Sequence, residues 1–406
     1  MTRIDLTHRL TSSSPPAIPA RPLLWDVFCR VIDNHGDLGV LWRLSCQLAD
    51  RGHSVRLWVD DASALVWMAP DGHRGVQIYP WASSSDESQL AAFPMADVWI
   101  EGFGCEIESI FIAHFAFDKS AEAAFDSNNP VWINLEYLTA ERYAERCHGL
   151  PSPVLHGPAT GHVKHFFYPG FTAATGGLLR ERDLAQRQQH FNRSNWLAAH
   201  GIPWSGERLM SLFCYEPAYL AGWLQQLSES ALPTVLLVTA GRATQAVKSA
   251  CQQLGWHGQG HGQLRLHPLP ALTQTDYDHL LWASDMNAVR GEDSLVRALW
   301  ARKPFLWHIY PQDDGAHHAK LTAFLDWADA PADVRQLHTW WNTTTTLPPS
   351  SADPSPDTPT HPPQMDWASA QAWANRLADR LQSQPDLVTQ LLTSLPASVA
   401  EPAKVP

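Results

Sequence analysis

The sequence predicts an α/β protein built from two Rossmann-like domains in tandem. Short apolar runs alternate with segments whose apolar residues recur at helical spacing, from residue 25 to about residue 341. An aromatic and glycine-rich passage over residues 166–182 interrupts this alternation once. With 406 residues, the chain is long enough for two domains that each have a sizeable core.

The first half begins with a strand, a helix and a second strand. Residues 25–32 are an apolar run, residues 40–50 carry apolar residues at helical spacing, and residues 54–59 are again apolar. Two more short strands are expected at residues 96–100 and 131–135. The polar ends of these strands should line one crevice, because ligands bind at the carboxyl ends of the strands in such folds.

The second half repeats the pattern after a polar helix expected over residues 183–200. Its predicted strands are residues 209–214, 234–239, 264–266, 286–289 and 305–309, and its predicted helices are residues 217–227, 243–254, 277–283 and 294–301.

Changes in composition predict the domain boundaries. Five segments follow: a disordered tail over residues 1–21, an N-terminal domain over 22–182, a C-terminal domain over 183–342, a Pro/Thr/Ser-rich insert over 343–364, and C-terminal helices over 365–396 that pack back on the N-terminal domain.

Composition and charge exclude several classes of function. The net charge of −12 argues against a non-specific nucleic-acid binder, which needs a basic face. We find no basic amphipathic helix and no long apolar run, so no membrane association is expected. The six cysteines are scattered and include no C-x-x-C pair, which favours the reducing cytoplasm.

The turn after the first strand is acidic. Asp33 and Asp37 flank Gly36 at the expected start of a helix, and Gly39 follows. A dinucleotide-binding turn would instead show G-x-G-x-x-G, and two carboxylates would repel a phosphate. The pair therefore suits a cation, an acid/base role, or simple capping of the helix.

The corresponding turn of the second half favours an anion. Arg290 and the hydroxyl of Ser294, with the amides of the helix start, could hold a phosphate or diphosphate. Glu292 and Asp293 could bond sugar hydroxyls or serve as helix caps. An acidic turn and an anion-binding turn facing each other across a cleft look like the GT-B architecture of glycosyltransferases, in which the C-terminal domain binds the nucleotide-sugar and the N-terminal domain the acceptor.

Several longer motifs support a closer resemblance, to the EarP family of bacterial protein-arginine rhamnosyltransferases. The motifs are residues 28–39 (FCRVIDNHGDLG), 132–137 (WINLEY), 167–171 (FYPGF), 175–179 (TGGLL), 211–216 (SLFCYE), 289–294 (VRGEDS) and 309–312 (IYPQ).

The resemblance implies a reaction and its partners. Enzymes of this family transfer rhamnose from dTDP-β-L-rhamnose, with inversion, to one arginine of translation elongation factor P, which is thereby activated to rescue ribosomes stalled at polyproline. It implies neither a cofactor nor a metal ion, and no nucleic-acid or membrane partner.

The resemblance also implies roles for individual residues. Asp33, Asp37 and Glu292 are expected to be catalytic, and the expected donor-binding residues are Phe213 and Tyr215 around the thymine base, with Arg290, Glu292, Asp293, Ser294, Gln312 and Gly36 around the diphosphate and sugar. Two positions depart from the family pattern. His35 stands where Tyr or Phe is expected, and Ala288 where an aromatic residue is more usual, so packing near both turns should differ.

An arginine acceptor would give the acidic turn a purpose. Carboxylates bind a guanidinium through charge-assisted hydrogen bonds. Full deprotonation of a group with a pKa near 13.8 by an ordinary carboxylate would cost roughly 13 kcal/mol, so it is not expected before attack. Our hypothesis is that the aspartates localise the charge of the guanidinium and that Asp37 accepts the proton as the C–N bond forms.

Other interpretations stay open at this point. The D-x-D sequence Asp276-Tyr277-Asp278 could bind a metal in a different glycosyltransferase architecture, but we expect it to cap the helix that begins at Tyr277. The paired histidines, such as His317 and His318, are expected to be surface or satisfied residues. A nucleotide-sugar epimerase of the same architecture and a non-catalytic nucleotide-sugar-binding regulator are the alternative functions.

Overall fold

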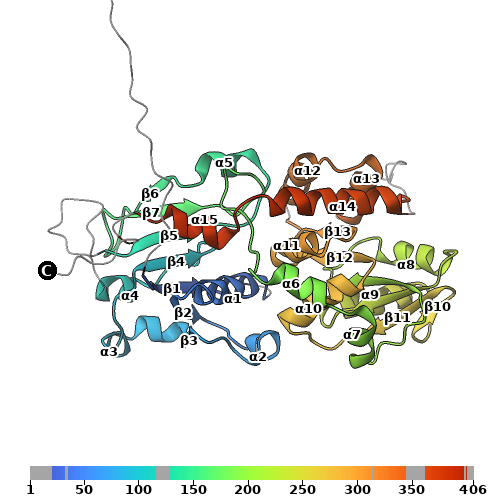
Figure 1. Cartoon of the computed structure of the whole chain (residues 1–406), viewed down its shortest axis with the longest axis horizontal. Helices are drawn as coiled ribbons and strands as arrows, with labels where there is room; N and C mark the ends of the chain where they lie inside the picture. Colours follow the sequence, from blue (N-terminus) through green and yellow to red (C-terminus); the bar gives the residue numbers. More distant parts are fainter. Residues whose placement is uncertain are drawn as a thin grey trace, which may run out of the picture.

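The computed structural model describes residues 21–32, 35–115, 129–312, 314–343, 362–396 and 399. Two sheets with helices on both faces lie side by side along the long axis of the molecule (Figure 1). This arrangement confirms the predicted α/β fold with two Rossmann-like domains. The N-terminal tail and most of the Pro/Thr/Ser-rich insert lie outside the described residues, as do Asp33 and Asn34 of the acidic turn.

The N-terminal sheet has seven strands in the order β3-β2-β1-β4-β5-β7-β6, and all neighbouring pairs except β6 with β7 are parallel. Its strands are β1 (Leu24–Cys29), β2 (Ser54–Val59), β3 (Val76–Pro80), β4 (Val98–Gly102), β5 (Val131–Leu135), β6 (Pro151–Pro153) and β7 (Val163–Phe167).

The central strands of this sheet are buried along nearly their whole length, which explains their continuous apolar sequence. Asp26 on β1 is a charged exception that the sheet compensates internally. Its two oxygens accept hydrogen bonds of 2.6 Å from Nε and Nη2 of Arg56 on β2, and Trp58 donates a third of 2.7 Å. A buried carboxylate is tolerated because it is paired and hydrogen-bonded.

The C-terminal sheet has six strands in the order β10-β11-β9-β8-β12-β13, with only β10 antiparallel to its neighbour. Its strands are β8 (Arg208–Leu212), β9 (Thr234–Val238), β10 (Gly260–His261), β11 (Leu264–Pro268), β12 (Met286–Arg290) and β13 (Phe305–His308).

The helices that cover the sheets mostly follow the predicted pattern, with earlier starts at the functional turns. The N-terminal helices are α1 (Gly36–Ala49), α2 (Leu65–Met68), the 3₁₀ helix η1 (Trp81–Ser85), α3 (Glu87–Leu90), α4 (Ser109–His114) and α5 (Arg142–Cys147), and the later ones are α6 (Leu184–His190), α7 (Arg193–Ala199), α8 (Leu220–Ser228), α9 (Arg242–Gln253), α10 (Gln274–Ala283), α11 (Gly291–Ala301), α12 (Ala316–Trp327) and α13 (Ala332–Trp341).

The single helix predicted over residues 183–200 is wrong, because α6 and α7 are separate helices. Phe191 is extended after α6, and the side chain of Asn192 then accepts a hydrogen bond from the amide of Asn195 to cap α7. An Asn with extended backbone is a common start of a helix, and here it divides one polar run into two.

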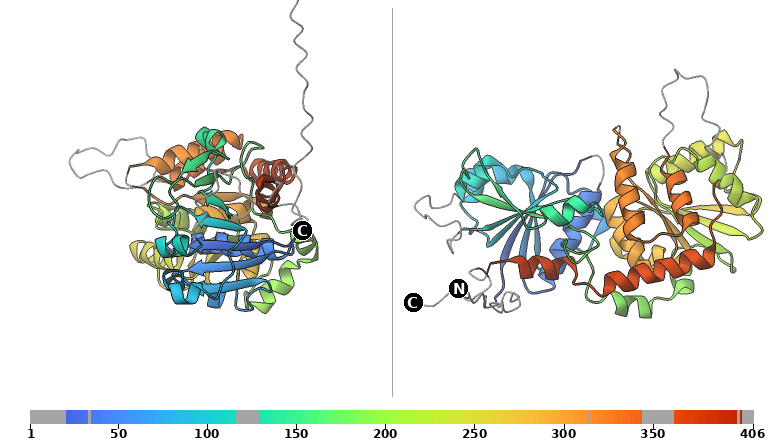
Figure 2. Two further views of the ribbon diagram at one scale, coloured as in Figure 1. Left: turned by 90° about the vertical axis from the view of Figure 1, so that its left-hand side faces the viewer. Right: turned by 90° about the horizontal axis from the view of Figure 1, so that it is seen from above.

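The last two helices connect the two halves of the molecule. Helix α14 (Trp367–Gln382) packs against α11 of the C-terminal half, and α15 (Leu387–Ser394) packs against α1 of the N-terminal half (Figure 2). Leu387, Val388, Leu391 and Leu392 of α15 are part of the same core cluster as the residues of β1 and α1. Helix α15 therefore completes the core of the first domain.

Candidate active site at the domain boundary

The starts of helices α1 and α11 lie close together where the two halves meet. The helices pack against each other, and Gln274 at the start of α10 donates a hydrogen bond of 3.0 Å to the carbonyl oxygen of Gly39 on α1. A Cβ atom at Gly39 would lie only 3.6 Å from a carboxylate oxygen of Asp293 on α11. The acidic turn and the anion-favouring turn are thus neighbours in space.

Asp37 lies within the first turn of α1. The capping position directly before the helix is occupied by His35, whose side chain makes no capping hydrogen bond. Asp37 lies inside the helix, so its interpretation as the helix cap is not supported. The hydroxyl of Tyr137, which follows β5, donates to Asp37 Oδ2 at 3.4 Å, and the ring of Tyr137 stacks on Phe103 at 4.7 Å. Asp37 is half-buried, which holds its carboxylate at the boundary rather than in free solvent.

The surroundings of Asp37 raise its pKa to about 7. Burial of the carboxylate is the largest cause, repulsion from Glu292 adds to it, and the hydrogen bond from Tyr137 opposes both. A carboxylate with this pKa is a much stronger base than an ordinary aspartate and is about half ionised at neutral pH. Asp37 therefore has the property that a general base requires.

Glu292, in the first turn of α11, bridges the two halves. One of its oxygens accepts a hydrogen bond of 2.7 Å from the amide of Leu138 in the N-terminal half. The other accepts one of 2.6 Å from Nζ of Lys320 on α12. Neither interaction caps its own helix, and one of them joins Glu292 to the other half of the molecule.

Arg290 ends β12 and presents its guanidinium to aromatic rings that follow β8. The guanidinium lies 4.4 Å from the ring centre of Phe213 and 4.8 Å from that of Tyr215, and it donates to the carbonyl oxygen of Cys214 at 3.2 Å. Burial lowers its pKa, although arginine stays protonated at any physiological pH. This places a fixed positive charge at the carboxyl ends of the strands.

The turn at Arg290 depends on a glycine. Gly291 has a φ of 66°, which favours glycine, and a Cβ atom there would lie 3.3 Å from the hydroxyl of Tyr215. The ring of Tyr215 also packs edge-on against His308 at 5.3 Å and Tyr310 at 5.4 Å. Residues from β8, β12 and β13 thus form one continuous surface at this edge of the sheet.

Two other predicted donor-binding residues make local contacts. Ser294 Oγ accepts a hydrogen bond of 3.0 Å from the amide of Arg290 and donates to its carbonyl oxygen, so this hydroxyl stabilises the turn. The amide of Gln312 donates to Nδ1 of His317 at 3.1 Å, while Gln312 itself is exposed. His317 is 2% exposed and its Nδ1 is hydrogen-bonded, so of the two expected alternatives, a surface or a satisfied histidine, it is not the surface one.

Asp293 lies at the turn but faces the other domain. Its Oδ1 is 3.3 Å from Nε of Arg43 on α1, so the contact that the structure gives it is an ion pair between domains. Gly36 is exposed at the start of α1, and Asp33 lies outside the described residues. Donor binding by Asp293 and Gly36 and catalysis by Asp33 therefore stay predictions.

The residues at the two departures from the family pattern pack locally. His35 lies edge-on to Trp67 of α2, with ring centres 6.2 Å apart. Ala288 is 1% exposed inside β12 and belongs to the core of the C-terminal half.

The expected caps at Asp276 and Asp278 are wrong. Helix α10 begins at Gln274, and the side chain of Thr273 caps it by accepting from the amide of Asp276. Asp278 instead pairs with Arg297 at 2.7 Å inside the protein. Among the described residues, no three His, Cys, Asp or Glu side chains group as ligands of a metal ion would.

Sequence reasoning did not identify three residues that shape this site. Lys320 pairs with Glu292, Tyr137 donates to Asp37, and Arg43 pairs with Asp293 from the other domain. Of these three residues, Tyr137 alone belongs to a motif of the family resemblance. Lys320 and Arg43 are distant in sequence from their partners and carry no local signal.

Within the described part of the chain, no helix is both long and apolar enough to cross a bilayer.

Comparisons with known proteins agree with this geometry. The protein-arginine rhamnosyltransferase of Pseudomonas aeruginosa is 43% identical over 339 residues, which cover 78% of this chain and 85% of the relative. That of Pseudomonas putida is 38% identical over 400 residues, which cover 91% of this chain and 97% of the relative.

A solved structure described as the structural basis for EarP-mediated arginine glycosylation of translation elongation factor EF-P superposes with a TM-score of 0.57 at 30% identity, over 91% of this chain and 97% of that one. The two facing α/β domains are those of the GT-B architecture. The model of the EarP family, described as Elongation-Factor P (EF-P) rhamnosyltransferase, matches residues 25–395. The chain is therefore a glycosyltransferase and belongs to the EarP family.

Proposed function

We propose that this enzyme transfers L-rhamnose from dTDP-β-L-rhamnose to an arginine side chain of elongation factor P, with inversion at the anomeric carbon. Membership of the EarP family and the names of the relatives support the sugar and the acceptor. The observation that carries the mechanism is Asp37, a half-buried carboxylate at the domain boundary whose pKa is raised to about 7 by burial and by the charge of Glu292.

The acceptor guanidinium would bind at the acidic turn of α1. Asp37 offers a carboxylate there, and Asp33 four residues earlier would offer a second. Two carboxylates can hold a planar guanidinium through charge-assisted hydrogen bonds and concentrate its positive charge on the nitrogens that they contact. The remaining nitrogen then regains part of the electron pair that it needs to attack carbon.

The transfer is a single displacement in this proposal. The guanidinium nitrogen forms a bond to the anomeric carbon while the bond from that carbon to the phosphate oxygen breaks, and the electron pair leaves with dTDP. Attack from the face opposite the leaving group inverts the configuration. The proton that the nitrogen loses goes to Asp37, whose pKa of about 7 suits a base at neutral pH.

The leaving diphosphate would be stabilised by Arg290 and by the start of α11. The guanidinium of Arg290 is held in place by Phe213, Tyr215 and the carbonyl of Cys214, so it needs no reorganisation during the reaction. The first amides of a helix have no partner within the helix and favour an anion. These charges would replace a divalent cation, and we expect transfer to proceed in excess EDTA.

Incubation of the protein with dTDP-rhamnose and elongation factor P tests the proposal. We expect the factor to gain the mass of one deoxyhexose on an arginine, with an α-linkage detectable by NMR. An epimerase would change the sugar nucleotide without any protein acceptor, and a regulator would bind the donor without turnover. Either of those results would refute the proposed function. As its acceptor is a translation factor, we place the reaction in the cytoplasm.

A further inference from the structure

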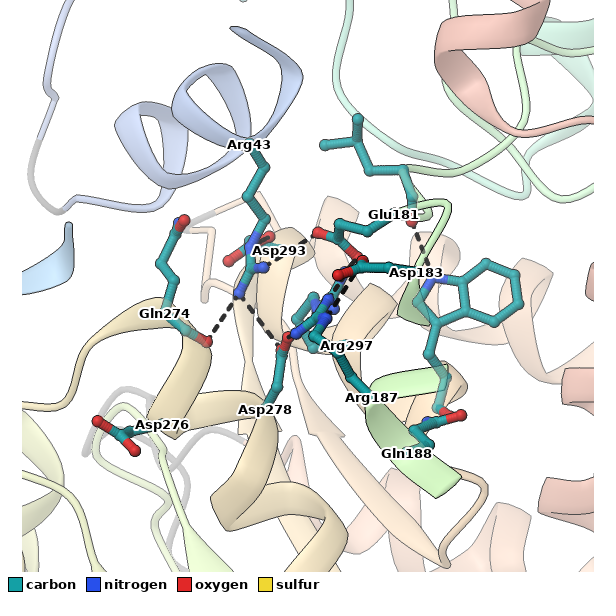
Figure 3. Close-up of polar contacts among 12 residues, drawn as sticks. Arg43, Glu181, Asp183, Arg187, Gln188, Gln274, Asp276, Asp278, Asp293 and Arg297 are labelled. Atoms are coloured by element: carbon teal, nitrogen blue, oxygen red, sulfur yellow. Dashed lines mark hydrogen bonds and ion pairs between the residues drawn. The ribbon is translucent and has the colours of Figure 1, made fainter. Parts of the chain in front are cut away.

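A buried cluster of charged side chains lies beside the proposed active site. Arg43 comes from α1, and the passage between the two halves contributes Glu181 (Figure 3). The other charged members come from α6, α10 and α11, and they are Arg187, Asp278, Asp293 and Arg297. Arg43 is the member of this group that belongs to the helix of the acidic turn.

All three nitrogens of the Arg43 guanidinium face oxygens of the C-terminal half or of the passage that leads to it. Nε lies 3.3 Å from Asp293 Oδ1, Nη1 lies 3.2 Å from Glu181 Oε1, and Nη2 lies 3.4 Å from Asp278 Oδ1. Nη2 also donates to the carbonyl oxygen of Gln274 at 3.3 Å. The planar guanidinium is thus fixed in both position and rotation.

Arg297 of α11 is the most deeply paired arginine of the cluster. It is 1% exposed and donates hydrogen bonds of 2.7 Å to both oxygens of Asp278 and to Glu181. Three arginines face three carboxylates in this buried cluster, and Arg187 also pairs with Asp183 at 3.2 Å. Burial alone would raise the pKa of Glu181, but the charges of Arg297 and Arg43 outweigh it and hold this pKa well below its usual range, so the carboxylate stays ionised throughout the physiological range.

Arg43 and Asp293 lie on the same two helices as Asp37 and Glu292, so their ion pair can hold these two residues in position. Arg43 lies six residues after Asp37 on the same helix, and Asp293 directly follows Glu292. The hydrogen bond from Gln274 to the carbonyl of Gly39 ties α1 to the C-terminal half at a second point. An interaction between Arg43 and Asp293 therefore fixes the helix that carries the proposed base against the helix that carries Glu292.

We propose that Arg43 and Asp293 form an interdomain clasp whose role is to position Asp37 against Glu292, and that the carboxylate of Asp293 does not bind the donor. This inference rests on the proposed function for its kinetic consequence. It assigns Asp293 to positioning, in contrast to the donor-binding role expected from its place in the turn. Small misplacements of reacting groups can reduce turnover about a hundredfold without any loss of binding.

The variants Asp293→Asn and Arg43→Lys test the clasp. With both substrates saturating, we expect each to lower kcat by about ten- to a hundredfold, while the dissociation constant of dTDP-rhamnose measured by calorimetry stays within about twofold. The kcat of the double variant should lie within about twofold of the kcat of the slower single variant, because both changes break the same interaction. A tenfold weaker donor affinity in Asp293→Asn would overturn the proposal, as would unchanged turnover in Arg43→Lys.

The buried pair of Asp26 and Arg56 supplies a matched control. Its side chains are 0% and 4% exposed and 2.6 Å apart, but both residues lie within the N-terminal sheet. Arg56→Lys should therefore lower the thermal midpoint without a selective loss of kcat. A loss of turnover in Arg56→Lys equal to that in Arg43→Lys would mean that kcat reports only general instability, and would overturn the clasp.

Small-angle X-ray scattering separates the clasp from the proposed reaction. The ligand-free protein should scatter as one domain arrangement with a fixed radius of gyration. Arg43→Lys should broaden the pair-distance distribution, whereas Arg56→Lys should not. This measurement needs no substrate, so it tests the clasp independently of the reaction. The clasp proposal can be refuted while rhamnosyl transfer is observed, and it can be supported while transfer is not observed. Identical scattering from all three proteins would overturn the clasp.

Discussion

The carboxyl group of Asp37 is the titrating group on which the proposed reaction depends. Its pKa is raised to about 7, and only the ionised form can accept a proton. We therefore expect kcat/KM to rise with pH and to reach half its maximum near pH 7. Rates measured from about pH 5.5 to 8.5 would check this, since they bracket the pKa. A profile that is flat across this range would contradict the assignment of the base.

Replacing Asp37 with Asn should abolish turnover while the donor still binds. General-base catalysis contributes about 10²- to 10⁴-fold, so a loss of that size is expected in kcat. Calorimetry should give an unchanged dissociation constant for dTDP-rhamnose, because Asp37 is assigned to the acceptor. Glu292→Gln should differ by weakening donor binding directly. Full activity of Asp37→Asn would refute the mechanism.

The raised pKa of Asp37 also makes the stability of the folded protein depend on pH. Because the folded pKa of Asp37 exceeds the unfolded value near 3.8, its ionisation destabilises the native state, and this cost grows between about pH 4 and pH 7. Asp37→Asn should therefore gain on the order of 1 kcal/mol over the wild type at about pH 8, after allowance for solvent screening. Thermal midpoints at about pH 5 and pH 8 would show the gap widening. A gap that narrows would contradict the shift.

Lys320 tunes the same group through Glu292. Without this cation, the charge of Glu292 would be less compensated and would disfavour ionised Asp37 more strongly. Tyr137 also faces Asp37 and would be unchanged. We expect Lys320→Met to move the midpoint of the pH–rate profile upward by about half a unit to one unit.

A second lysine–glutamate pair provides the control for Lys320. Lys164 lies 2.6 Å from Glu101 in the N-terminal sheet, the same distance as Lys320 from Glu292. Lys164→Met should leave the midpoint in place. If the two lysine variants shift the midpoint equally, the effect of Lys320 on Asp37 is not specific.

At the scale of elements, the junction between the passage and the last helix depends on one glycine. Gly177 has a φ of 70°, and a Cβ atom there would lie 2.8 Å from the carbonyl oxygen of Pro385, directly before α15. Leu387 at the start of α15 also donates to the carbonyl of Leu178 at 2.8 Å. A side chain at position 177 would push the two segments apart.

We expect Gly177→Ala to lower the thermal midpoint clearly more than Gly201→Ala. Gly201 has a similar φ of 63°, but a Cβ atom there would meet nothing within 4 Å. The Gly201 variant therefore reports backbone strain alone, about 1–2 kcal/mol. Scanning calorimetry of the two variants isolates the steric contribution. Equal losses would mean that contact with Pro385 is unimportant.

The order of strands and helices could largely be predicted from the sequence because parallel strands buried on both faces are continuously apolar. The strands β2 and β5 have the predicted bounds, and α1 and α11 begin earlier than predicted. The break at Asn192 and the start of α10 at Thr273 were missed because a single polar side chain decides each of them. Periodicity describes buried faces and says little about ends of helices.

The residues of the candidate site also fall into those that local sequence could predict and those that it could not. The acidic turn and the turn at Arg290 could be found as local sequence, since each lies between a strand and a helix. The partners Lys320 and Arg43 could not, because their pairing depends on how distant helices pack. Even the direction of the Asp293 carboxylate depends on Arg43 from the other domain.

For the whole molecule, the clasp and the last two helices predict a single unfolding transition. Helices α14 and α15 pack on different halves, and Arg51 on the N-terminal half pairs with Asp386 at 2.5 Å. Calorimetry of the full chain should show one cooperative transition. Truncation after Ser383, which removes α15, should lower the stability of the N-terminal domain and split the transition in two. Two transitions in the intact chain would contradict this coupling.

The position of α15 also affects how the protein is made. Four residues of this helix fill the core beside β1 and α1, yet they are synthesised only after the whole C-terminal sheet. At roughly 5–20 residues per second, the first domain would wait about 10–40 s with an apolar face uncovered. During synthesis, chaperones that bind nascent chains would have their longest opportunity at this face, and the N-terminal half can reach its final packing only after α15 has been made.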